Sequence, residues 1–274
     1  MKTCVSTYSF GRYFGELGLA GTIRKAAELG FDAIEFVEGN WMRGADAAET
    51  VRKTCAEVGI TPIALCVGAD FLNNGDEVDR VEGLLRFAKE MGVSMLRHDV
   101  VYSDRGLSFD EIIERIAPKI RRVAEYAQGL GIRTMTENHG FISQDAHRVK
   151  ALIEAVDHPN FHALIDIGNF LCADEYPPKS VETLLPYAIH VHAKDFHVKS
   201  ADEQNPGSGW FCSRGGNYLR GTIIGHGDAD AEKSLRLIRG SGYDGYVTVE
   251  FEGPEDNLQG IRQGLDNLRR FLQA

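Results

Sequence analysis

In the second half of the chain, four successive apolar stretches each end at a side chain that can bind a metal ion. One acidic residue after a strand means little, because turns are rich in acidic side chains. Four in succession, each after its own apolar stretch, indicate a single site. Three carboxylates and one imidazole suit Mn²⁺, Mg²⁺, Co²⁺ or Zn²⁺ and do not resemble a structural thiolate site. The four residues are Glu137, Asp166, His192 and Glu250.

Two of these residues can also move protons. A carboxylate beside a bound metal ion can remove a proton from a carbon next to a carbonyl, while the ion stabilises the enediolate. A second carboxylate then returns the proton. We assign this pair to Glu137 and Glu250 and treat Asp166 and His192 as ligands only. His192 would need an acceptor for its other ring nitrogen, and the sequence does not identify one.

Strand-like and helix-like stretches alternate along the whole chain. Several helices end at a glycine, such as Gly30 or Gly131, and an apolar strand begins a residue or two later. Such short joints are typical of a parallel sheet. The expected strands are 4–10, 32–37, 62–67, 95–101, 132–137, 161–167, 188–193 and 246–251. The expected helices are 20–29, 46–58, 78–91, 109–130, 144–156, 181–187, 231–238 and 257–272.

Eight such units without a linker predict an α/β fold, a single (β/α)8 TIM barrel over residues 1–274. The four candidate ligands would then meet at the mouth formed by the carboxyl ends of the strands. A doubly wound sheet is the alternative. It would usually have a Gly-rich phosphate loop after its first strand, and residues 6–11 do not form one.

The longest connection runs from about residue 196 to 229 and contains Trp210, Phe211 and Tyr218. A connection of this length in a compact barrel is typical of a lid or binding loop. A disordered insertion is the alternative, but its aromatic side chains argue against that.

Seven further residues are candidates to contact a substrate. Lys194 could neutralise an enediolate, or it could pair with its neighbour Asp195. Glu35 could bind sugar hydroxyls or form a salt bridge, and His98 could contact substrate or pack in the core. The other four candidates are His139, Asn169, Arg220 and His226.

Composition narrows the class of protein. The net charge of −10 argues against nucleic-acid binding, which usually requires a basic face. The five scattered cysteines, odd in number, indicate reduced thiols. No stretch is apolar for long enough to span a membrane, and no signal peptide is evident. We expect a cytoplasmic protein with a small-molecule substrate, and a homo-oligomer is compatible with a barrel of this size.

Along nearly its whole length the chain resembles the xylose isomerase-like barrel superfamily of sugar phosphate isomerases and epimerases. The resemblance implies the Mn²⁺ or Co²⁺ site of the ketose 3-epimerases, with Glu137 and Glu250 as acid and base. It also favours His192 over His190 and Glu250 over Glu252, pairs that share a strand face. Its motifs are Glu137-Asn-His-Gly, Asp166-Ile-Gly-Asn, His192-Ala-Lys-Asp, Gly225-His-Gly-Asp-Ala-Asp and Gly242-Tyr-Asp-Gly-Tyr-Val-Thr-Val-Glu250.

The chain also departs from those epimerases. They carry a His where this chain has Asn169, and an Arg near the position of Lys194 and Asp195. The His-x-Lys-Asp pattern is more similar to inosose dehydratases and isomerases. We therefore expect a divalent-metal-dependent isomerase or epimerase acting on a sugar, keto-sugar or cyclitol, with Mn²⁺ as the first choice of ion. A lyase or dehydratase that uses the same enolate is the alternative.

Two other functions are less favoured. A non-catalytic sugar-binding barrel would be expected to lose some of the four ligands. An endonuclease for abasic DNA has a similar fold, but it needs a trinuclear zinc cluster built from additional histidines. The third strand ends at Cys66-Val-Gly-Ala-Asp70 without a histidine, and Asn169 replaces another expected ligand.

Overall fold

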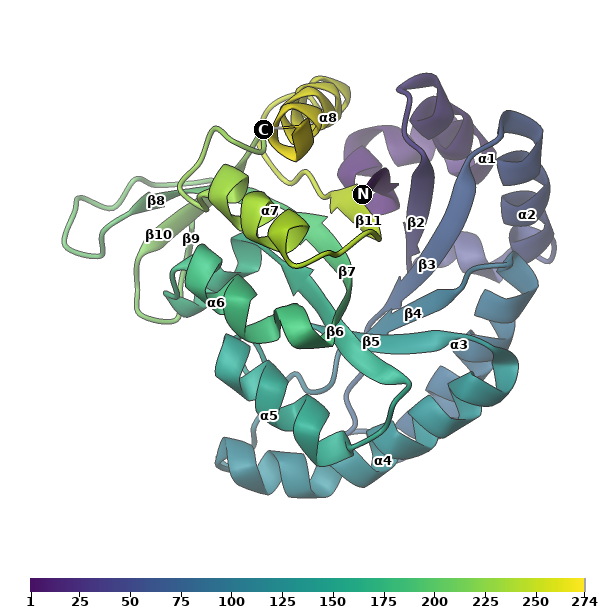
Figure 1. Ribbon diagram of the computed structural model, residues 1–274, viewed down its shortest axis with the longest axis horizontal. Coiled ribbons are helices and arrows are strands. Elements are labelled where there is room, and N and C mark those ends of the chain that lie inside the picture. The colour runs from purple at the N-terminus through teal and green to yellow at the C-terminus, as the bar shows by residue number, and fades with distance from the viewer. Residues whose placement is uncertain (274) are drawn as a thin grey trace.

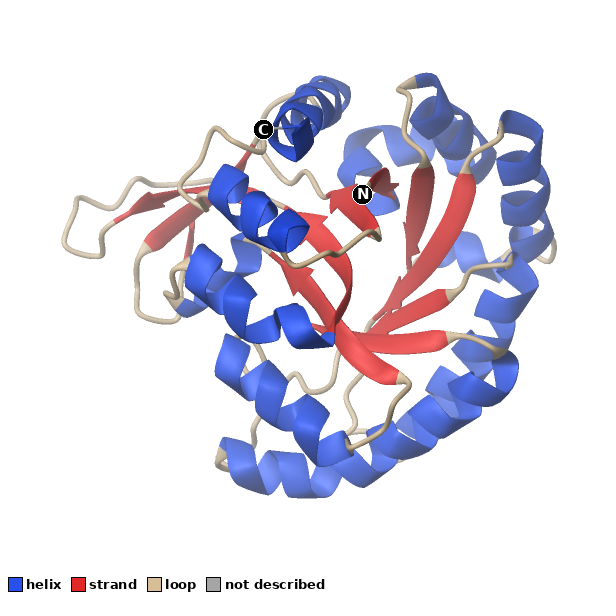
Figure 2. Ribbon diagram, in the orientation of Figure 1, coloured by secondary structure: helices blue, strands red, loops and turns tan. Residues whose placement is uncertain are grey.

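In the computed structural model, which describes residues 1–273, eight parallel strands close into a barrel and helices lie around it (Figure 1). Figure 2 shows the strands on the inside and the helices on the outside. Strand β1 pairs with both β2 and β11, which closes the barrel and confirms the predicted (β/α)8 fold. In barrel order the strands are β1 (Lys2–Ser6), β2 (Ala33–Val37), β3 (Thr61–Val67), β4 (Met95–His98), β5 (Arg133–Glu137), β6 (Phe161–Asp166), β7 (Ala188–Ala193) and β11 (Tyr246–Val249).

The helices end as the glycine pattern predicts. Gly92 and Gly131 adopt left-handed conformations, with φ of 79° and 71°, directly after α3 and α4. The first helix is longer than predicted, because a segment from Gly11 joins it across a kink at Gly18, where φ is 63°. The helices are α1 (Gly11–Glu28), α2 (Ala47–Val58), α3 (Glu77–Met91), α4 (Phe109–Leu130), α5 (Ala146–Val156), α6 (Pro177–Leu184), α7 (Ala231–Gly240) and α8 (Asn257–Gln273).

The inside of the barrel has an apolar floor and a polar mouth. Side chains two residues apart on a strand share a face. The residue two positions after an inward-facing floor residue therefore also points into the barrel, nearer to its mouth. Met135 on the floor is followed by Glu137 at the mouth, and Leu164 is followed by Asp166. The floor cluster consists of Cys4, Ala33, Ile63, Ala64, Met95, Met135 and Leu164. A larger core lies between the barrel and its helices.

The long connection after β7 is an ordered antiparallel sheet of three strands, β8 (Asp195–Lys199), β10 (Tyr218–Thr222) and β9 (Phe211–Cys212). Figure 1 shows it projecting from the side of the barrel where α6 and α7 lie. Its two ends are tied together by Asp195, whose carboxylate accepts hydrogen bonds from the backbone amides of Gly225, Gly227 and Ala229. Asp195 therefore binds the loop and does not pair with Lys194.

Two further findings concern membranes and thiols. Among residues 1–273 there is no helix with the length and apolar character needed to cross a bilayer. The cysteines carry free thiols, and of them Cys212 is exposed while the others are buried.

Candidate metal centre and active site

The four predicted ligands come together at the carboxyl ends of neighbouring strands. Strands β5, β6, β7 and β11 lie side by side in the barrel, and each contributes one ligand from its last two residues or from the residue directly after it. Asp166 on β6 is directly opposite His192 on β7 in the strand register. One ligand atom from each residue lies within 4.8 Å of the others, and all four residues are buried.

The spacing of these atoms fits a cation among them. Nδ1 of His192 lies 3.5 Å from Oε2 of Glu250, 3.7 Å from Oε1 of Glu137 and 3.8 Å from Oδ2 of Asp166. Nδ1 of His192 and Oδ2 of Asp166 are buried without a hydrogen-bond partner. Buried polar atoms are seldom left unsatisfied, so a divalent ion bonded to them would account for both.

The directions of the pKa shifts indicate that added positive charge would stabilise this cluster. Burial raises the pKa of Asp166 to about 7, with Glu137 and Glu250 adding to the effect and Lys194 opposing it. Burial lowers the pKa of His192, but Glu35 and Glu250 outweigh it and raise the pKa well above its ordinary value. Both groups therefore favour a proton, which a bound cation would have to displace.

Two buried cationic side chains, Arg97 and Lys194, form ion pairs with Glu137 and Glu250. Nη2 of Arg97, on β4, lies 2.6 Å from Oε2 of Glu137 and 2.9 Å from Oδ1 of Asp99. Nζ of Lys194 lies 2.6 Å from Oε2 of Glu250 and 3.2 Å from Oε2 of Glu252. Charge-assisted bonds of this length fix each glutamate at one oxygen. The predicted candidate Lys194 is thus at the site.

Arg97 was not predicted from the sequence, and its neighbour His98 was the predicted site residue. His98 is fully buried with its ring between those of Phe71 and Phe161, at centroid distances of 5.3 Å and 5.6 Å. It belongs to the core and does not line the cavity above the ligands. Burial lowers its pKa to about 4. The period of two places Arg97, not His98, on the inward face shared with Met95.

His139 and Asn169 both lie at the site. Nδ1 of His139 is 2.9 Å from Oδ1 of Asp99, and its ring lines the cavity. Burial lowers the pKa of His139, but the bond to Asp99 outweighs it and raises the pKa. Asn169 donates its side-chain amide to Oε1 of Glu137 and its backbone N–H to Oδ1 of Asp166, each at 2.9 Å. Asn169 therefore orients two of the ligands.

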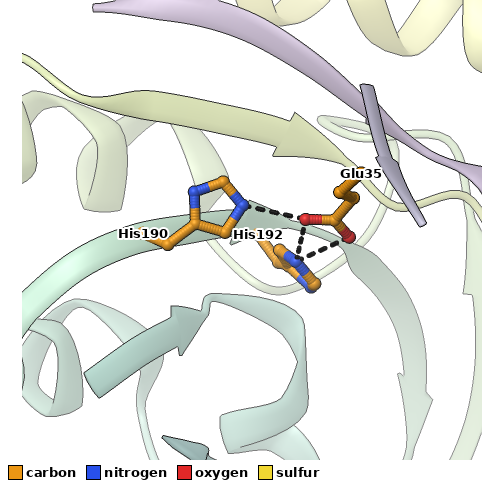
Figure 3. Close-up of side chains that lie close together, drawn as sticks. All are labelled: Glu35, His190 and His192. Carbon is orange, nitrogen blue, oxygen red and sulfur yellow. Dashed lines mark hydrogen bonds and ion pairs between the residues drawn. The ribbon is translucent and has the colours of Figure 1, made fainter. Parts of the chain in front are cut away.

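Glu35 lies beneath the site and not at its mouth. It is fully buried and does not line the cavity, so it is not placed to bind sugar hydroxyls as expected. Figure 3 shows its carboxylate in contact with the rings of both His190 and His192. Burial raises its pKa, but the two imidazoles outweigh it and lower the pKa below its ordinary range.

The structure does not bring two other candidates to the site. Arg220 lies on β10 in the projecting sheet, with its guanidinium 5.0 Å from the centre of the Trp210 ring. His226 is exposed where the long connection returns towards the barrel. Neither residue lines the cavity above the four ligands.

That cavity has a volume of about 460 Å³, which suits a small molecule. Its lining includes Arg97, His139 and Lys194, and the carboxylates Glu38 and Glu252. Polar groups of both signs in this lining suit a compact substrate with several oxygen atoms.

The chain is similar in sequence to inosose dehydratases. An inosose dehydratase of Lacticaseibacillus casei is 26% identical over 187 residues, which cover 67% of this chain and 62% of that protein. The chain therefore spans about three fifths of the length of that relative.

Two solved structures share the fold. The IOLI protein with a bound zinc atom is 16% identical, with a TM-score of 0.77 over 100% of this chain and 98% of the other. The 3-keto-D-glucoside 4-epimerase YcjR of E. coli is 18% identical, with a TM-score of 0.72 over 98% of this chain and 99% of the other. At these identities the likeness establishes the fold alone.

A family model described as "Xylose isomerase-like TIM barrel" matches residues 23–271, nearly the whole chain. The chain belongs to the xylose isomerase-like TIM-barrel family.

Proposed function

We propose that this protein is a divalent-metal-dependent isomerase or epimerase that acts on a sugar, keto-sugar or cyclitol. The observation that carries the proposal is the convergence of Glu137, Asp166, His192 and Glu250 within 4.8 Å beneath a cavity of about 460 Å³. An oxygen-rich set with one imidazole is compatible with Mn²⁺, which we propose as the ion. Free thiols support a reducing compartment such as the cytoplasm.

When bound by these four residues, a divalent cation would supply the positive charge that polarises a substrate carbonyl. Proton movement then falls to the two glutamates. Glu137 is held at both oxygens, by Asn169 at 2.9 Å and by Arg97 at 2.6 Å. The close bond of Glu250 is to Lys194 through Oε2. We infer that the less restrained Glu250 removes a proton from the substrate and that Glu137, in its protonated form, donates a proton to the neighbouring carbon. Exchange with solvent then restores the starting protonation of both glutamates.

A dehydratase is the second candidate, and one observation favours it. His139 and Asp99 both line the cavity, and Nδ1 of His139 lies 2.9 Å from Oδ1 of Asp99. A histidine supported by a carboxylate can donate a proton to a departing hydroxyl group, which would convert the same enolate into an unsaturated product. The similarity to inosose dehydratases supports this alternative.

Solvent exchange separates the two reactions. The Mn²⁺-loaded protein would be incubated in D₂O with inososes, ketohexoses and 3-keto-glucosides, and the products analysed by mass spectrometry and NMR. Deuterium at the carbon beside the carbonyl, in a product that has not lost water, indicates an isomerase or epimerase. A product that has lost water indicates a dehydratase. No exchange across the panel would contradict both.

A matched pair of variants tests the assigned base. Glu250→Gln should abolish exchange, because an amide cannot accept the proton. Glu252→Gln alters a carboxylate that also contacts Lys194 but lies outside the four-ligand set, so it should retain most of the activity. Equal activity in the two variants would contradict the role of Glu250.

A further inference from the structure

Directly beneath the metal centre lies a second polar cluster, which shares His192 with it. We call it the Glu35 cluster, and its members are Glu35, His190, His192 and Thr248, each at most 1% exposed. Glu35 comes from β2, which is separated from β7 in the barrel by β1 and β11. Its side chain therefore reaches across the barrel interior to the histidines on β7, as Figure 3 shows.

The contacts of Glu35 all involve possible donors. Its Oε2 lies 2.8 Å from Nε2 of His190, and Nε2 of His192 lies 3.0 Å from both of its carboxylate oxygens. The hydroxyl of Thr248 lies 3.3 Å from Oε2 of Glu35 and 3.0 Å from Nε2 of His190. An ionised carboxylate only accepts hydrogen bonds, so the facing ring nitrogens must carry protons.

This arrangement determines which nitrogen of His192 can bind a metal ion. A neutral imidazole has one N–H and one lone pair. With the proton on Nε2, the lone pair is on Nδ1, and Nδ1 is the atom that faces the other three ligands at 3.5–3.8 Å. The contact with Glu35 also fixes the plane of the ring.

We propose that Glu35 is a positioning residue of the metal centre, which holds the His192 ring with its proton on Nε2 and its Nδ1 lone pair towards the ion. His190 and Thr248 hold Glu35 in turn. This inference rests on the proposed metal-dependent function. Partners that orient a metal-binding histidine typically change metal affinity by about 10- to 100-fold when they are replaced.

A second metal site formed by Glu35, His190 and His192 is the competing interpretation, since their ligand atoms are also close together. The geometry favours hydrogen bonding instead. The separations of 2.8–3.0 Å are those of direct hydrogen bonds, with no room for an ion between the atoms. Neither Glu35 nor His190 lines the cavity through which an ion would enter. We therefore expect one ion per chain.

The test is the Mn²⁺ affinity of the purified full-length Glu35→Gln variant, measured by competition with a chelator. A glutamine side chain has one acceptor oxygen, and its NH₂ group would face one of the two ring N–H groups. One histidine must then turn or change its protonated nitrogen. We expect Mn²⁺ affinity to fall about 10- to 100-fold. Unchanged affinity would overturn the proposal.

Two further variants separate positioning from general damage. Thr248→Val removes one hydroxyl that contacts Glu35 but leaves both imidazole contacts, so the loss of affinity should be smaller than in Glu35→Gln. Glu77→Gln removes a buried carboxylate that pairs with Arg80 on α3, and it should leave the affinity unchanged. A comparable loss of affinity in Glu77→Gln would overturn the specific role of Glu35.

A measurement on the wild-type protein keeps the proposal testable even if Glu35→Gln fails to fold. In nitrogen NMR of the Zn²⁺-loaded protein, His190 and His192 should each carry a proton on Nε2, whereas a proton on Nδ1 of His192 would overturn the proposal. Wild-type protein that binds neither ion would contradict the proposed function itself. Two ions per wild-type chain and one in Glu35→Gln would favour the second site.

Discussion

At the residue scale, the buried guanidinium of Arg97 has the greatest consequence for stability. It neutralises Glu137 and Asp99 at 2.6 Å and 2.9 Å. Arg97→Gln would leave two buried carboxylates without the guanidinium that neutralises them, and the free energy of unfolding should fall by about 3–5 kcal/mol in urea denaturation. The control Arg122→Gln breaks exposed pairs with Asp79 and Glu82 and should cost at most about 1 kcal/mol. Similar losses in the two variants would contradict this.

Individual residues also show which parts of the site could be predicted from the sequence. The four ligands were predictable because each follows an apolar stretch on a strand, and strand ends meet at one mouth of a barrel. Arg97 could have been found from its spacing of two from Met95, but an arginine inside an apolar strand attracts less notice than a histidine. The burial of Glu35 depends on side chains from β7 and β11, which are distant in sequence, so no local pattern reports it.

At the element scale, the projecting sheet depends on one carboxylate. Asp195 accepts hydrogen bonds from the amides of Gly225, Gly227 and Ala229 at 2.8–3.0 Å. In Asp195→Asn an NH₂ group replaces one acceptor, so the bonds at one end of the connection weaken. Stability should fall by about 1–3 kcal/mol. Hydrogen exchange at these three amides should accelerate, and unchanged exchange would show that Asp195 does not hold the loop.

Strand β4 carries a pH-dependent contribution to stability. Burial lowers the pKa of His98 from 6.5 to about 4 in the folded protein. A depressed folded pKa means that the stabilisation is present above the unfolded pKa and is lost as pH falls through the folded value. Between pH 7 and 4, His98→Leu should lose less unfolding free energy than wild type, by a difference on the order of 3 kcal/mol. Parallel pH profiles would contradict this.

The elements themselves were only partly predictable. Helices that end in glycine and begin the next strand soon after, such as α3 and α4, were predicted within a few residues because the signal is local. The three-stranded sheet was missed, because β9 has two residues and its pairing with β10 joins segments without a clear alternating pattern. The extension of α1 depends on the positive φ at Gly18, which the sequence allows but does not require.

At the scale of the whole molecule, metal binding should stabilise the barrel. Three buried carboxylates repel one another at its mouth, and an ion that binds only the folded state relieves this. A Mn²⁺ concentration 100-fold above Kd should raise Tm by roughly 5–10 °C. Because the pKa of Asp166 is raised to about 7, protons compete with the ion at low pH, and the shift should be larger at pH 8 than at pH 6. Asp166→Asn should abolish most of the shift in thermal denaturation, and an equal shift in that variant would contradict the assignment.

The eight-fold alternation of strands and helices made the barrel predictable, and the barrel in turn explains why ligands spread over more than a hundred positions of sequence meet. The central claim is therefore geometric: Glu137, Asp166, His192 and Glu250 bind one cation. The most direct measurement is an anomalous difference map from crystals soaked in Mn²⁺. We expect one peak bonded to Nδ1 of His192 and to the three carboxylates. A map with no peak there, or with its peak between Glu35 and His190, would contradict it.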